Sequence, residues 1–280
     1  MGKLRLDTLL AERGLFPSRS RAAASVMAGE VFLVPGHDGA RAGERRAAKP
    51  GELVDIETHV RVAQGPAFVS RGGIKLANAL EACGLQVQGR RALDVGASTG
   101  GFSDCLLQRG VREVIAVDVG YGILDYRLRT DERVAVLERT NARELTPEML
   151  PVPWLPGDAP LDLATVDVSF ISLSKVLGTV LGCLDAHYDV LALVKPQFEL
   201  GRERIGKGGV VRAADDRREA LVGVGRAALE LGAAVAGYHS SGLPGPKGNR
   251  ETFLWLVDPD DGRGSRDASL LEQLAREVEP

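Results

Sequence analysis

The sequence predicts an α/β protein in which a doubly wound, seven-stranded sheet follows a small N-terminal α+β module. From residue 90 onward, apolar runs alternate with helical segments, and a glycine-rich turn comes directly after the first run. Before residue 60, two short amphipathic helices are followed by strand-like segments. With 280 residues, of which 44% are hydrophobic and 26% charged, the chain can bury one large hydrophobic core or two smaller ones.

The predicted organisation has four segments. Residues 1–60 form the N-terminal module, and residues 61–69, which lack periodicity and contain a Gly-Pro pair, form a linker. The sheet domain covers residues 70–258. Residues 259–280 are expected to be a polar tail with one short helix and no catalytic role.

The N-terminal module begins with a helix pair. Leu6, Leu9 and Leu10 share one face of the first helix, and Ser18 can cap the second. Residues 1–50 carry nine Lys/Arg against five Asp/Glu, a balance of +4, which leaves −7 for the rest of a chain with a net charge of −3. A basic helix pair suits contacts with phosphates, although an ordinary solvated surface explains the same charges.

The module also resembles a known family. The stretch RLDTLLAERGLFPSRSRAAASVMAGEVFLVPG, residues 5–36, is similar to the S-four-type RNA-binding domain in its Arg-Leu-Asp opening, its Ser-Arg start of the second helix and its Gly-x-Val entry into a strand. The resemblance implies that the module binds RNA. The arginines expected to contact RNA are Arg5, Arg13, Arg19, Arg21 and Arg71.

The sheet domain is predicted from seven apolar runs. In a doubly wound sheet the ligand binds beyond the carboxyl ends of the strands, so the side chains at those ends are the functional candidates. The predicted strands cover residues 91–96, 113–120, 133–140, 161–170, 189–196, 233–241 and 251–257. The predicted helices between them cover residues 101–110, 124–129, 142–150, 171–184 and 213–231.

The turn LDVGASTGGF, residues 93–102, is the first candidate for cofactor binding. Its glycines let the backbone approach a bound molecule and lead into a helix N-terminus. Asp118 follows one β-α-β unit later, where a carboxylate can hold ribose hydroxyls. The turn is not the dinucleotide motif G-x-G-x-x-G. A glycine turn followed by a carboxylate can nevertheless bind either NAD or S-adenosylmethionine. Glycines that only pack a helix on a strand would give the same pattern.

With Asp94 at its start, the same turn resembles the first motif of class I methyltransferases. The resemblance implies a class I methyltransferase sheet with S-adenosylmethionine as the cofactor. Asn141, after the third strand, is a candidate for contact with adenine, although a turn-forming role explains it equally. The expected cofactor-binding residues are Asp94, Gly96, Ser98, Gly100, Gly101, Phe102, Asp118 and Asn141.

The fourth strand and the cysteines narrow the choice of methyl acceptor. Methyltransferases of exocyclic base amines commonly show Asn/Asp-Pro-Pro-Tyr/Phe at the end of this strand, where the chain has DVSF. Cys183 lies inside a helical pattern, so covalent attack on a pyrimidine ring by this cysteine is not favoured. A hydroxyl acceptor remains.

The run DVLALVKPQFE, residues 189–199, places Lys195 at the end of a buried strand. Asp167 follows the neighbouring strand, and with these two charges alone a surface ion pair is the simpler interpretation. Two more charged residues favour a functional site over a surface ion pair. Lys75 lies on the first turn of a helix that leads into the domain, and Glu251 opens the last strand.

Five motifs in order resemble the TlyA-type rRNA 2′-O-methyltransferases of the haemolysin A family: VSRGGIKL, LDVGASTGGF, VDVSFISL, LVKPQFE and GNRETFLWL. That family joins an S-four-type domain to a sheet akin to FtsJ (RrmJ), and the likeness spans residues 4 to about 257. It implies methyl transfer from S-adenosylmethionine to a ribose 2′-hydroxyl of ribosomal RNA, with cytidine as the nucleotide and ribosomal subunits as partners. We expect the protein in the cytoplasm, because no signal peptide or membrane span is recognised in the sequence. Phe68 stands where relatives can carry Trp. The family's catalytic Lys-Asp-Lys-Glu tetrad maps onto Lys75, Asp167, Lys195 and Glu251.

The tetrad suggests a division of roles. A lysine with its ordinary pKa of about 10.4 is protonated at neutral pH, so a lysine that accepts a proton needs neighbours that disfavour its charged form. We expect Lys195 to be the base or to steer the hydroxyl, and Asp167 to orient it. Lys75 and Glu251 would hold the ribose and balance the charge. The basic, glycine-rich residues 199–211 are a candidate RNA-facing flap, although a solvated loop explains the same composition.

Different functional classes find less support in the sequence. Cys83, Cys105 and Cys183 form no CxxC pair and the histidines lack metal-ligand spacing, so no metal site is predicted. No segment reads as a membrane span or a signal peptide, which weighs against a membrane-active haemolysin-like protein. A non-catalytic RNA-binding protein and a nicotinamide-dependent reductase stay open as interpretations. The sequence does not indicate the oligomeric state.

Overall fold

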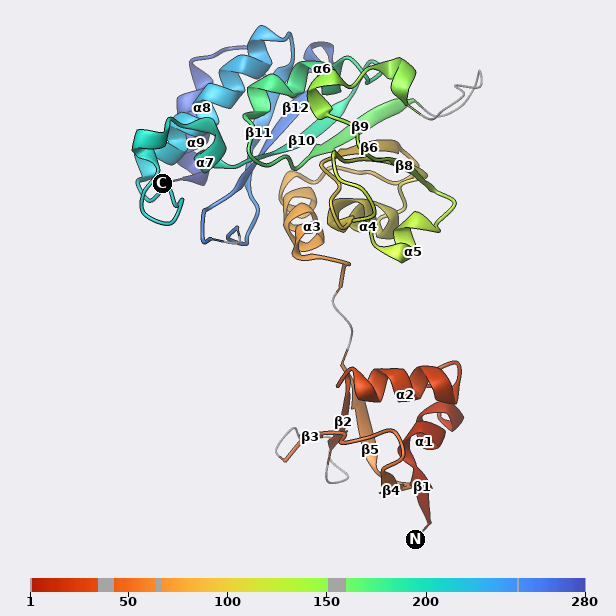
Figure 1. The fold of residues 1–280 in the computed structure, drawn as a ribbon. Coiled ribbons are helices and arrows are strands. Elements are labelled where there is room, and N and C mark those ends of the chain that lie inside the picture. The colour runs from red at the N-terminus through yellow and green to blue at the C-terminus, as the bar shows by residue number, and fades with distance from the viewer. Residues whose placement is uncertain (1, 35–42, 64–66, 151–159, 246, 280) are drawn as a thin grey trace. The chain divides into compact units, whose positions relative to one another are not determined.

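The chain divides into two compact units, Met1–Ala67 and Phe68–Pro280, each with a hydrophobic core of its own (Figure 1). The division falls inside the predicted linker, residues 61–69. The computed structural model describes residues 2–34, 43–63, 67–150, 160–245 and 247–279.

The first unit packs a helix pair against two small sheets. Its elements are β1 (Lys3–Arg5), α1 (Leu6–Glu12), α2 (Arg19–Met27), β2 (Val31–Val34), β3 (Arg45–Arg46), β4 (Leu53–Asp55) and β5 (His59–Val62). Leu6 and Leu10 of α1 and Ala22 of α2 are fully buried, so the predicted apolar face forms the core. Ser18 caps α2 as predicted, because its Oγ accepts a hydrogen bond from the Arg21 amide at 3.2 Å.

Strand β5 corrects the start of the predicted linker. It pairs antiparallel with β2, with Val62 opposite Val31, so residues 61 and 62 belong to the sheet. The strand lies at the edge of the β3-β2-β5 sheet, and its residues are exposed or half-buried. An edge strand of this kind shows no apolar run in the sequence, which explains why the predicted end of the module, residue 60, comes too early.

The second unit is built on a seven-stranded sheet, which confirms the predicted doubly wound fold. Its strands are β6 (Arg91–Val95), β7 (Glu113–Val117), β8 (Val134–Leu137), β9 (Leu161–Val166), β10 (Asp189–Val194), β11 (Ala234–Ser240) and β12 (Thr252–Val257). In the spatial order β11-β12-β10-β9-β6-β7-β8, β12 runs antiparallel to both of its neighbours and the other pairs are parallel. The chain runs outward from β6 to β8 and then returns to β9, beside β6, so the topological switch point lies between β6 and β9.

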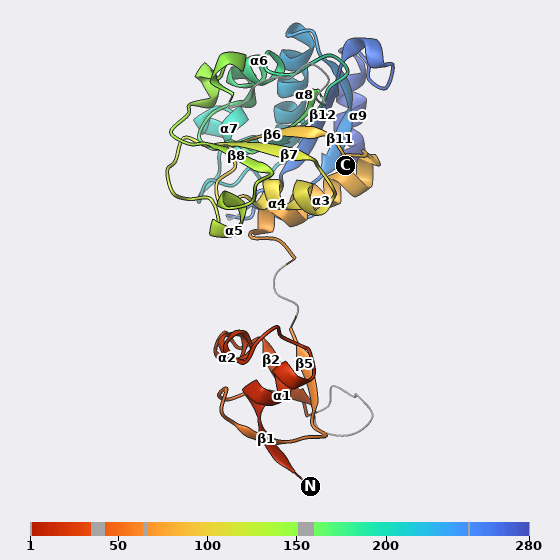
Figure 2. The ribbon, with the colours of Figure 1, turned by 90° about the vertical axis from the view of Figure 1, so that its right-hand side faces the viewer.

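Helices cover both faces of this sheet (Figure 2). They are α3 (Arg71–Cys83), α4 (Gly101–Gln108), α5 (Tyr126–Arg129), α6 (Leu177–Leu181), α7 (Pro196–Glu199), α8 (Ala214–Glu230) and α9 (Leu270–Val278). One core contains Leu76 of α3 and Leu106 of α4, and the other contains Leu177 of α6, Leu221 of α8 and Leu271 of α9. Successive residues of β10 enter these two cores alternately, which explains its uninterrupted apolar run.

Two predicted helices are shorter than expected. The segment 142–150 forms two 3-10 turns, η1 (Ala142–Glu144) and η2 (Pro147–Met149), because the proline that opens η2 cannot continue a preceding helix. The segment 171–184 forms the 3-10 turn η3 (Leu173–Lys175) followed by α6, and the residue between them departs from helical angles.

The C-terminal segment contains the short helix predicted within residues 259–280, but the segment is not a polar tail. Helix α9 packs on α8 and β11, and its Leu271 and Ala275 are buried. Glu279 forms a buried ion pair with Arg217 of α8 at 2.8 Å. The segment therefore completes one core of the sheet domain as far as residue 279, because its apolar residues recur at helical spacing between polar ones.

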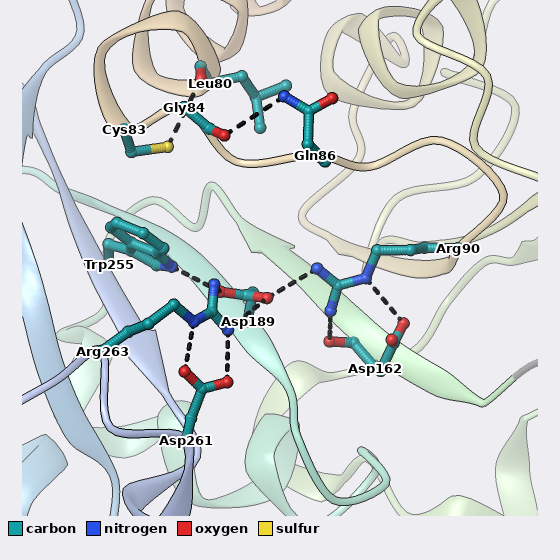
Figure 3. A network of polar contacts seen from close by, with 10 residues as sticks. All are labelled: Leu80, Cys83, Gly84, Gln86, Arg90, Asp162, Asp189, Trp255, Asp261 and Arg263. Carbon is teal, nitrogen blue, oxygen red and sulfur yellow. Dashed lines mark hydrogen bonds and ion pairs between the residues drawn. The ribbon is translucent and has the colours of Figure 1, made fainter.

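Arginines surround a buried carboxylate at the amino ends of β9 and β10 (Figure 3). Arg90 donates a hydrogen bond to Asp189 Oδ2 at 2.7 Å and another to Asp162 Oδ1 at 3.1 Å. Trp255 Nε1 donates to Asp189 Oδ1 at 2.8 Å, and Arg263 forms an ion pair with the same oxygen at 3.0 Å. Both oxygens of Asp189 are thus satisfied, and the network joins β9, β10 and β12 at this edge of the sheet.

Candidate active site

The ends of β6 and β9 are in direct contact at the switch point. The Asp167 amide donates a hydrogen bond to the Val95 carbonyl at 2.9 Å. Gly96 has a φ of +82°, and a Cβ atom at this position would lie 2.5 Å from the carbonyl oxygen of Asp167. Only glycine accommodates both the angle and the close approach. The glycine turn and the predicted catalytic aspartate therefore touch through their backbones.

Two adjoining cavities open at this edge of the sheet. The larger has a volume of ≈ 1090 Å³ and the smaller ≈ 380 Å³. Asp167 lines both cavities, and Lys75 lines the smaller one. The predicted cofactor-binding residues that line the larger cavity are Gly96, Ser98, Asp118 and Asn141. The cavities therefore share a wall at Asp167.

Asp118 follows β7 and presents its carboxylate to the larger cavity. Its Oδ2 accepts a hydrogen bond from the Ser98 amide at 2.8 Å, and its Oδ1 accepts one from the Gly120 amide at 2.7 Å. Asn141 caps η1 by accepting a hydrogen bond from the Arg143 amide at 3.2 Å, and it lines the same cavity. The turn-forming role and the cavity-lining position of Asn141 therefore coexist.

Asp94 lies beneath the glycine turn and does not line either cavity. It is fully buried and accepts hydrogen bonds from Ser103 Oγ at 2.6 Å and Thr165 Oγ1 at 2.9 Å. Burial raises the pKa of this carboxyl from 3.8 to about 6. Asp94 thus braces α4 and β9 below the turn, whereas the sequence predicted contact with the cofactor.

The other predicted cofactor residues divide between the site and the core. Gly101 and Phe102 line the smaller cavity. The Phe102 ring also packs on Phe253, with 5.6 Å between the ring centroids. Gly100 faces Leu128, which a Cβ at this position would overlap.

Lys195 and Asp167 form the first of two ion pairs at the site. Lys195 Nζ lies 2.5 Å from Asp167 Oδ1 and donates a hydrogen bond to Ser169 Oγ at 2.8 Å. Asp167 Oδ1 is buried, and the Lys195 amino group lies against it. An amine has more hydrogen-bonding capacity than these two contacts use.

Lys75 and Glu251 form the second ion pair, with side chains that are 9% and 1% exposed. Lys75 comes from α3, and Glu251 directly precedes β12. Because Lys75 and Asp167 line the same small cavity, both ion pairs reach it. The fold thus brings together the four residues that the sequence grouped as a tetrad.

Pro196 explains why the buried strand β10 ends with a lysine. A proline disfavours helical angles at the residue before it, and Lys195 is extended, with φ −113° and ψ 101°. Pro196 then takes the first position of α7, where its missing N–H has no partner to lose. The strand therefore stops at Lys195, and the side chain is delivered to the cavity edge.

A comparison with known families decides what kind of protein carries this site. The model of the FtsJ-like methyltransferases matches residues 68–257. The chain belongs to this family. It is 46% identical, over 261 residues, to the 16S/23S rRNA (cytidine-2'-O)-methyltransferase TlyA of Mycobacterium tuberculosis, which covers 92% of this chain and 91% of that protein. The predicted resemblance to TlyA-type methyltransferases is thereby confirmed.

Two further relatives support the assignment over nearly the whole chain. The "Putative rRNA methyltransferase YqxC" of Bacillus subtilis is 41% identical over 278 residues, which is 99% of this chain and 93% of that protein. A solved structure described as "Putative hemolysin" from Streptococcus thermophilus is 37% identical, covers 99% of this chain and 96% of that one, and superimposes with a TM-score of 0.68.

The arginines predicted to bind RNA differ in how strongly each one is bound to other groups of this FtsJ-like methyltransferase. Arg5 forms a hydrogen-bonded ion pair with Asp7 at 2.7 Å, and Arg13 donates to two backbone carbonyls of the loop after β4. Arg19 is 59% exposed and lies 3.8 Å from Asp7, and Arg21 is exposed. Arg19 and Arg21 are therefore more available to a ligand than Arg5 and Arg13.

Arg71 lies at the rim of the smaller cavity in the second unit. Its guanidinium donates a hydrogen bond to the Pro244 carbonyl at 2.9 Å, and both residues line that cavity. Arg71 is thus the predicted RNA-binding residue that the structure brings to the tetrad.

Sequence reasoning missed two features of this methyltransferase's site. Phe170 lines the larger cavity with φ +64° and 91% exposure, and its ring lies 5.2 Å from that of Phe198. Glu199 accepts hydrogen bonds from Ser172 Oγ at 2.6 Å and from the Leu173 amide at 3.0 Å, which ties the loop after β9 to α7. Burial raises the pKa of Glu199. The DVSF motif could have drawn attention to Phe170, whereas no local pattern reveals the contacts of Glu199.

Two features typical of different protein classes are absent from the part of the chain that the structure describes. It contains no cluster of three or more His, Cys, Asp or Glu side chains suited to a metal ion. None of its helices has the length and apolar character needed to cross a membrane.

Proposed function

We propose that this protein methylates the 2′-hydroxyl of a cytidine in ribosomal RNA, with S-adenosylmethionine as the methyl donor. The observation that carries the proposal is the convergence of two lysine–carboxylate pairs on a cavity that shares a wall with the glycine-turn cavity. The choice of rRNA and of cytidine follows the name of the M. tuberculosis relative. Ribosomal subunits are the proposed partner, and the cytoplasm is the proposed location.

The larger cavity fits S-adenosylmethionine in size and in chemistry. Small-molecule sites measure about 300–1,000 Å³, and this cavity is of that order. Gly96 lines this cavity, and Asp118 presents a carboxylate whose oxygens can each accept a further hydrogen bond. Asp118 is therefore the proposed partner of the ribose hydroxyls of the cofactor. When bound, the cofactor supplies a methyl group on a positively charged sulfur.

The side chains of the tetrad manage the proton and the orientation of the acceptor. Lys195, in its amine form, accepts the proton of the 2′-hydroxyl at Nζ as the oxygen attacks the methyl carbon. Asp167 and Ser169 fix Nζ from two directions, so its lone pair has a defined orientation. Lys75 donates to a ribose oxygen, and Glu251, which lines neither cavity, holds the Lys75 ammonium in place, while the pair adds no net charge. Holding the oxygen in line with the methyl group removes much of the entropic barrier.

Surface residues near the site suit an RNA substrate. The exposed ring of Phe170 lies beside the larger cavity, where it can stack on an unpaired base. Arg71 at the rim of the smaller cavity can contact a phosphate. In the first unit, the exposed Arg19 and Arg21 can bind the RNA backbone.

The proposal is tested by incubating the protein with methyl-labelled S-adenosylmethionine and ribosomal subunits that lack the modification. The expected result is label at one cytidine, in a linkage that resists alkaline hydrolysis, because a methylated 2′-oxygen cannot attack the neighbouring phosphate. Label that appears on a base, with every linkage alkali-sensitive, would contradict the proposal. Absence of transfer to either subunit would do the same.

A further inference from the structure

Asn249 is a buried amide that bonds to the loop following the lysine-bearing strand. The residue is 2% exposed. Its Oδ1 accepts a hydrogen bond from the Val211 amide at 2.9 Å, and its Nδ2 donates one to the Gly209 carbonyl at 2.8 Å. Both polar atoms of the side chain are therefore engaged by residues about 40 positions earlier in the chain, beyond α7.

The same residue shapes the segment that precedes β12. The carbonyl of Asn249 accepts a hydrogen bond from the Gly245 amide at 2.8 Å. Gly245 in turn packs so closely on Glu251 that a Cβ would overlap its Oε1. The Ser241 amide donates to the Glu251 carbonyl at 3.1 Å. Glu251 is thus enclosed by a turn that Asn249 closes.

The two segments joined by Asn249 carry the two ion pairs. Strands β10 and β12 pair antiparallel, and their last pair at this edge is Val194 with Thr252. One step further along the same register come Lys195 and Glu251. The side chain of Asn249 therefore ties together the chain beyond Lys195 and the chain before Glu251 at the point where the sheet hydrogen bonds end.

We propose that Asn249 is a positioning residue for methyl transfer: by joining these two segments, it holds Glu251, and through Glu251 the ammonium of Lys75, at the ribose site. The inference rests on the proposed function. Asn249 lines neither the larger nor the smaller cavity. Its replacement therefore affects the chemical step and leaves cofactor binding intact.

The first test compares Asn249→Ala and Asn249→Asp with the native protein. The aspartate keeps the acceptor for the Val211 amide but sets a carboxylate against the Gly209 carbonyl, so both variants disturb the junction. The expected result is a fall in kcat of about 10²-fold in each, as for a small misplacement of a reacting group. The Kd for S-adenosylmethionine stays unchanged. A kcat within about 2-fold of the native value in both variants would overturn the inference.

A matched control separates positioning from general stability. Tyr238 is buried, and its hydroxyl donates a hydrogen bond to the Leu221 carbonyl at 2.8 Å, on a core face away from both cavities. Tyr238→Phe also removes a buried hydrogen bond between a side chain and a carbonyl, so it lowers the melting temperature. Its kcat is expected to stay at the native value. If kcat falls equally in Tyr238→Phe and Asn249→Ala, the specific role of Asn249 is excluded.

A double variant tests whether Asn249 acts through Glu251. In a Glu251→Gln background, Asn249→Ala is expected to lower kcat by no more than about 2-fold, because the group that it positions has already been altered. The same fall in both backgrounds would show that the two residues act independently and would overturn the inference.

Hydrogen exchange in the absence of RNA separates this inference from the proposed function. In Asn249→Ala, amides of both segments, residues 206–211 and residues 241–245, are expected to exchange faster, whereas Tyr238→Phe leaves both unchanged. Native protection at Ser241, whose amide reports on Glu251, would refute the junction even if the enzyme is active. Failure of the native protein to methylate rRNA would refute the proposed function, while the exchange result would still decide whether Asn249 joins the segments.

Discussion

Strand β10 has a charged residue at each end, and the two ends are built differently. At its start, Asp189 is 2% exposed and accepts hydrogen bonds from Arg90 and Trp255 (Figure 3). Just beyond its other end, Lys195 pairs with Asp167 and donates to Ser169, and its amino group has capacity for a further hydrogen bond. One strand thus connects a carboxylate whose two oxygens are both hydrogen-bonded with a lysine that can still bind another group.

The difference shows how a charge pair serves stability or chemistry. Arginine stays protonated and its planar fork satisfies several acceptors at once, so the Asp189 network has no proton to exchange and little reason to move. Lysine can exist as an amine, and Lys195 retains hydrogen-bonding capacity beside a cavity. The start of β10 is therefore expected to govern folding, and its end to govern methyl transfer.

The largest expected effect is that of Lys195→Ala. Removal of the proposed base should lower kcat for methyl transfer by about 10²–10⁴-fold, the contribution typical of a positioned acid or base. The Kd for S-adenosylmethionine should change little, because Lys195 lines neither cavity wall. The melting temperature should fall, because the buried Oδ1 of Asp167 loses its ionic partner. Single-turnover kinetics measure methyl transfer, and calorimetry measures cofactor binding and the melting temperature. Undiminished transfer would remove the distinction between the two ends of the strand.

The converse substitution, Asp189→Asn, should act on stability alone. It leaves the guanidinium groups of Arg90 and Arg263 beside a neutral amide, and removal of one partner from a buried charge network costs about 3 kcal/mol. Denaturant unfolding measures this loss. At a temperature where the variant is folded, its kcat should equal the native value. A large fall in kcat would mean that the network also serves the site.

The Lys75–Glu251 pair is expected to serve both stability and methyl transfer, because it is as buried as Asp189 and also reaches the cavity. Glu251→Gln should therefore lower both kcat and the free energy of unfolding, the latter by about 2 kcal/mol, since a charged hydrogen bond is lost. In the double variant with Lys75→Met, no buried charge is left unpaired, so stability should partly return while kcat stays low. Parallel unfolding and activity measurements decide this. Recovery of both together would assign the pair to stability only.

Asp94 should give an effect that is visible as a dependence of stability on pH. Its pKa is raised to about 6 in the folded protein, mainly by burial. The folded state therefore holds a proton that the unfolded state releases as the pH rises from about 4 to about 6, so this carboxyl lowers the free energy of unfolding across that window. Asp94→Asn should gain stability relative to the native protein over the same window. Melting temperatures of both proteins measured from pH 4 to pH 7 test this, and a constant difference would refute it.

Sequence reasoning recovered the features that repeat along the chain or stand at strand ends. The apolar run of β10 predicted a strand buried on both faces, and the glycine turn and the tetrad predicted the edge of the sheet where the cavities open. The resemblance of five motifs supplied the family, which the comparison confirms. The apolar run and the glycine turn survive in a single sequence because each depends on residues close together in the chain, whereas the tetrad, spread over residues 75–251, came from the resemblance.

The missed features depend on contacts between distant segments. Strand β5 was hidden because it is an edge strand of only four residues, all of them exposed or half-buried. The bracing role of Asp94 depends on Thr165, 71 residues away, and the junction made by Asn249 depends on Gly209 and Val211. Sequence spacing could not distinguish a carboxylate beneath the glycine turn from one that faces the cavity.

The most direct test of the contrast uses one assay on three proteins. Transfer of a labelled methyl group to ribosomal subunits is measured for the native chain, for Lys195→Arg and for Asp189→Asn, at a temperature where all three are folded. The account predicts alkali-resistant label from the native chain and from Asp189→Asn, and none from Lys195→Arg, because arginine can keep the ion pair with Asp167 but cannot accept a proton. Native-like transfer by Lys195→Arg would contradict the assignment of the base.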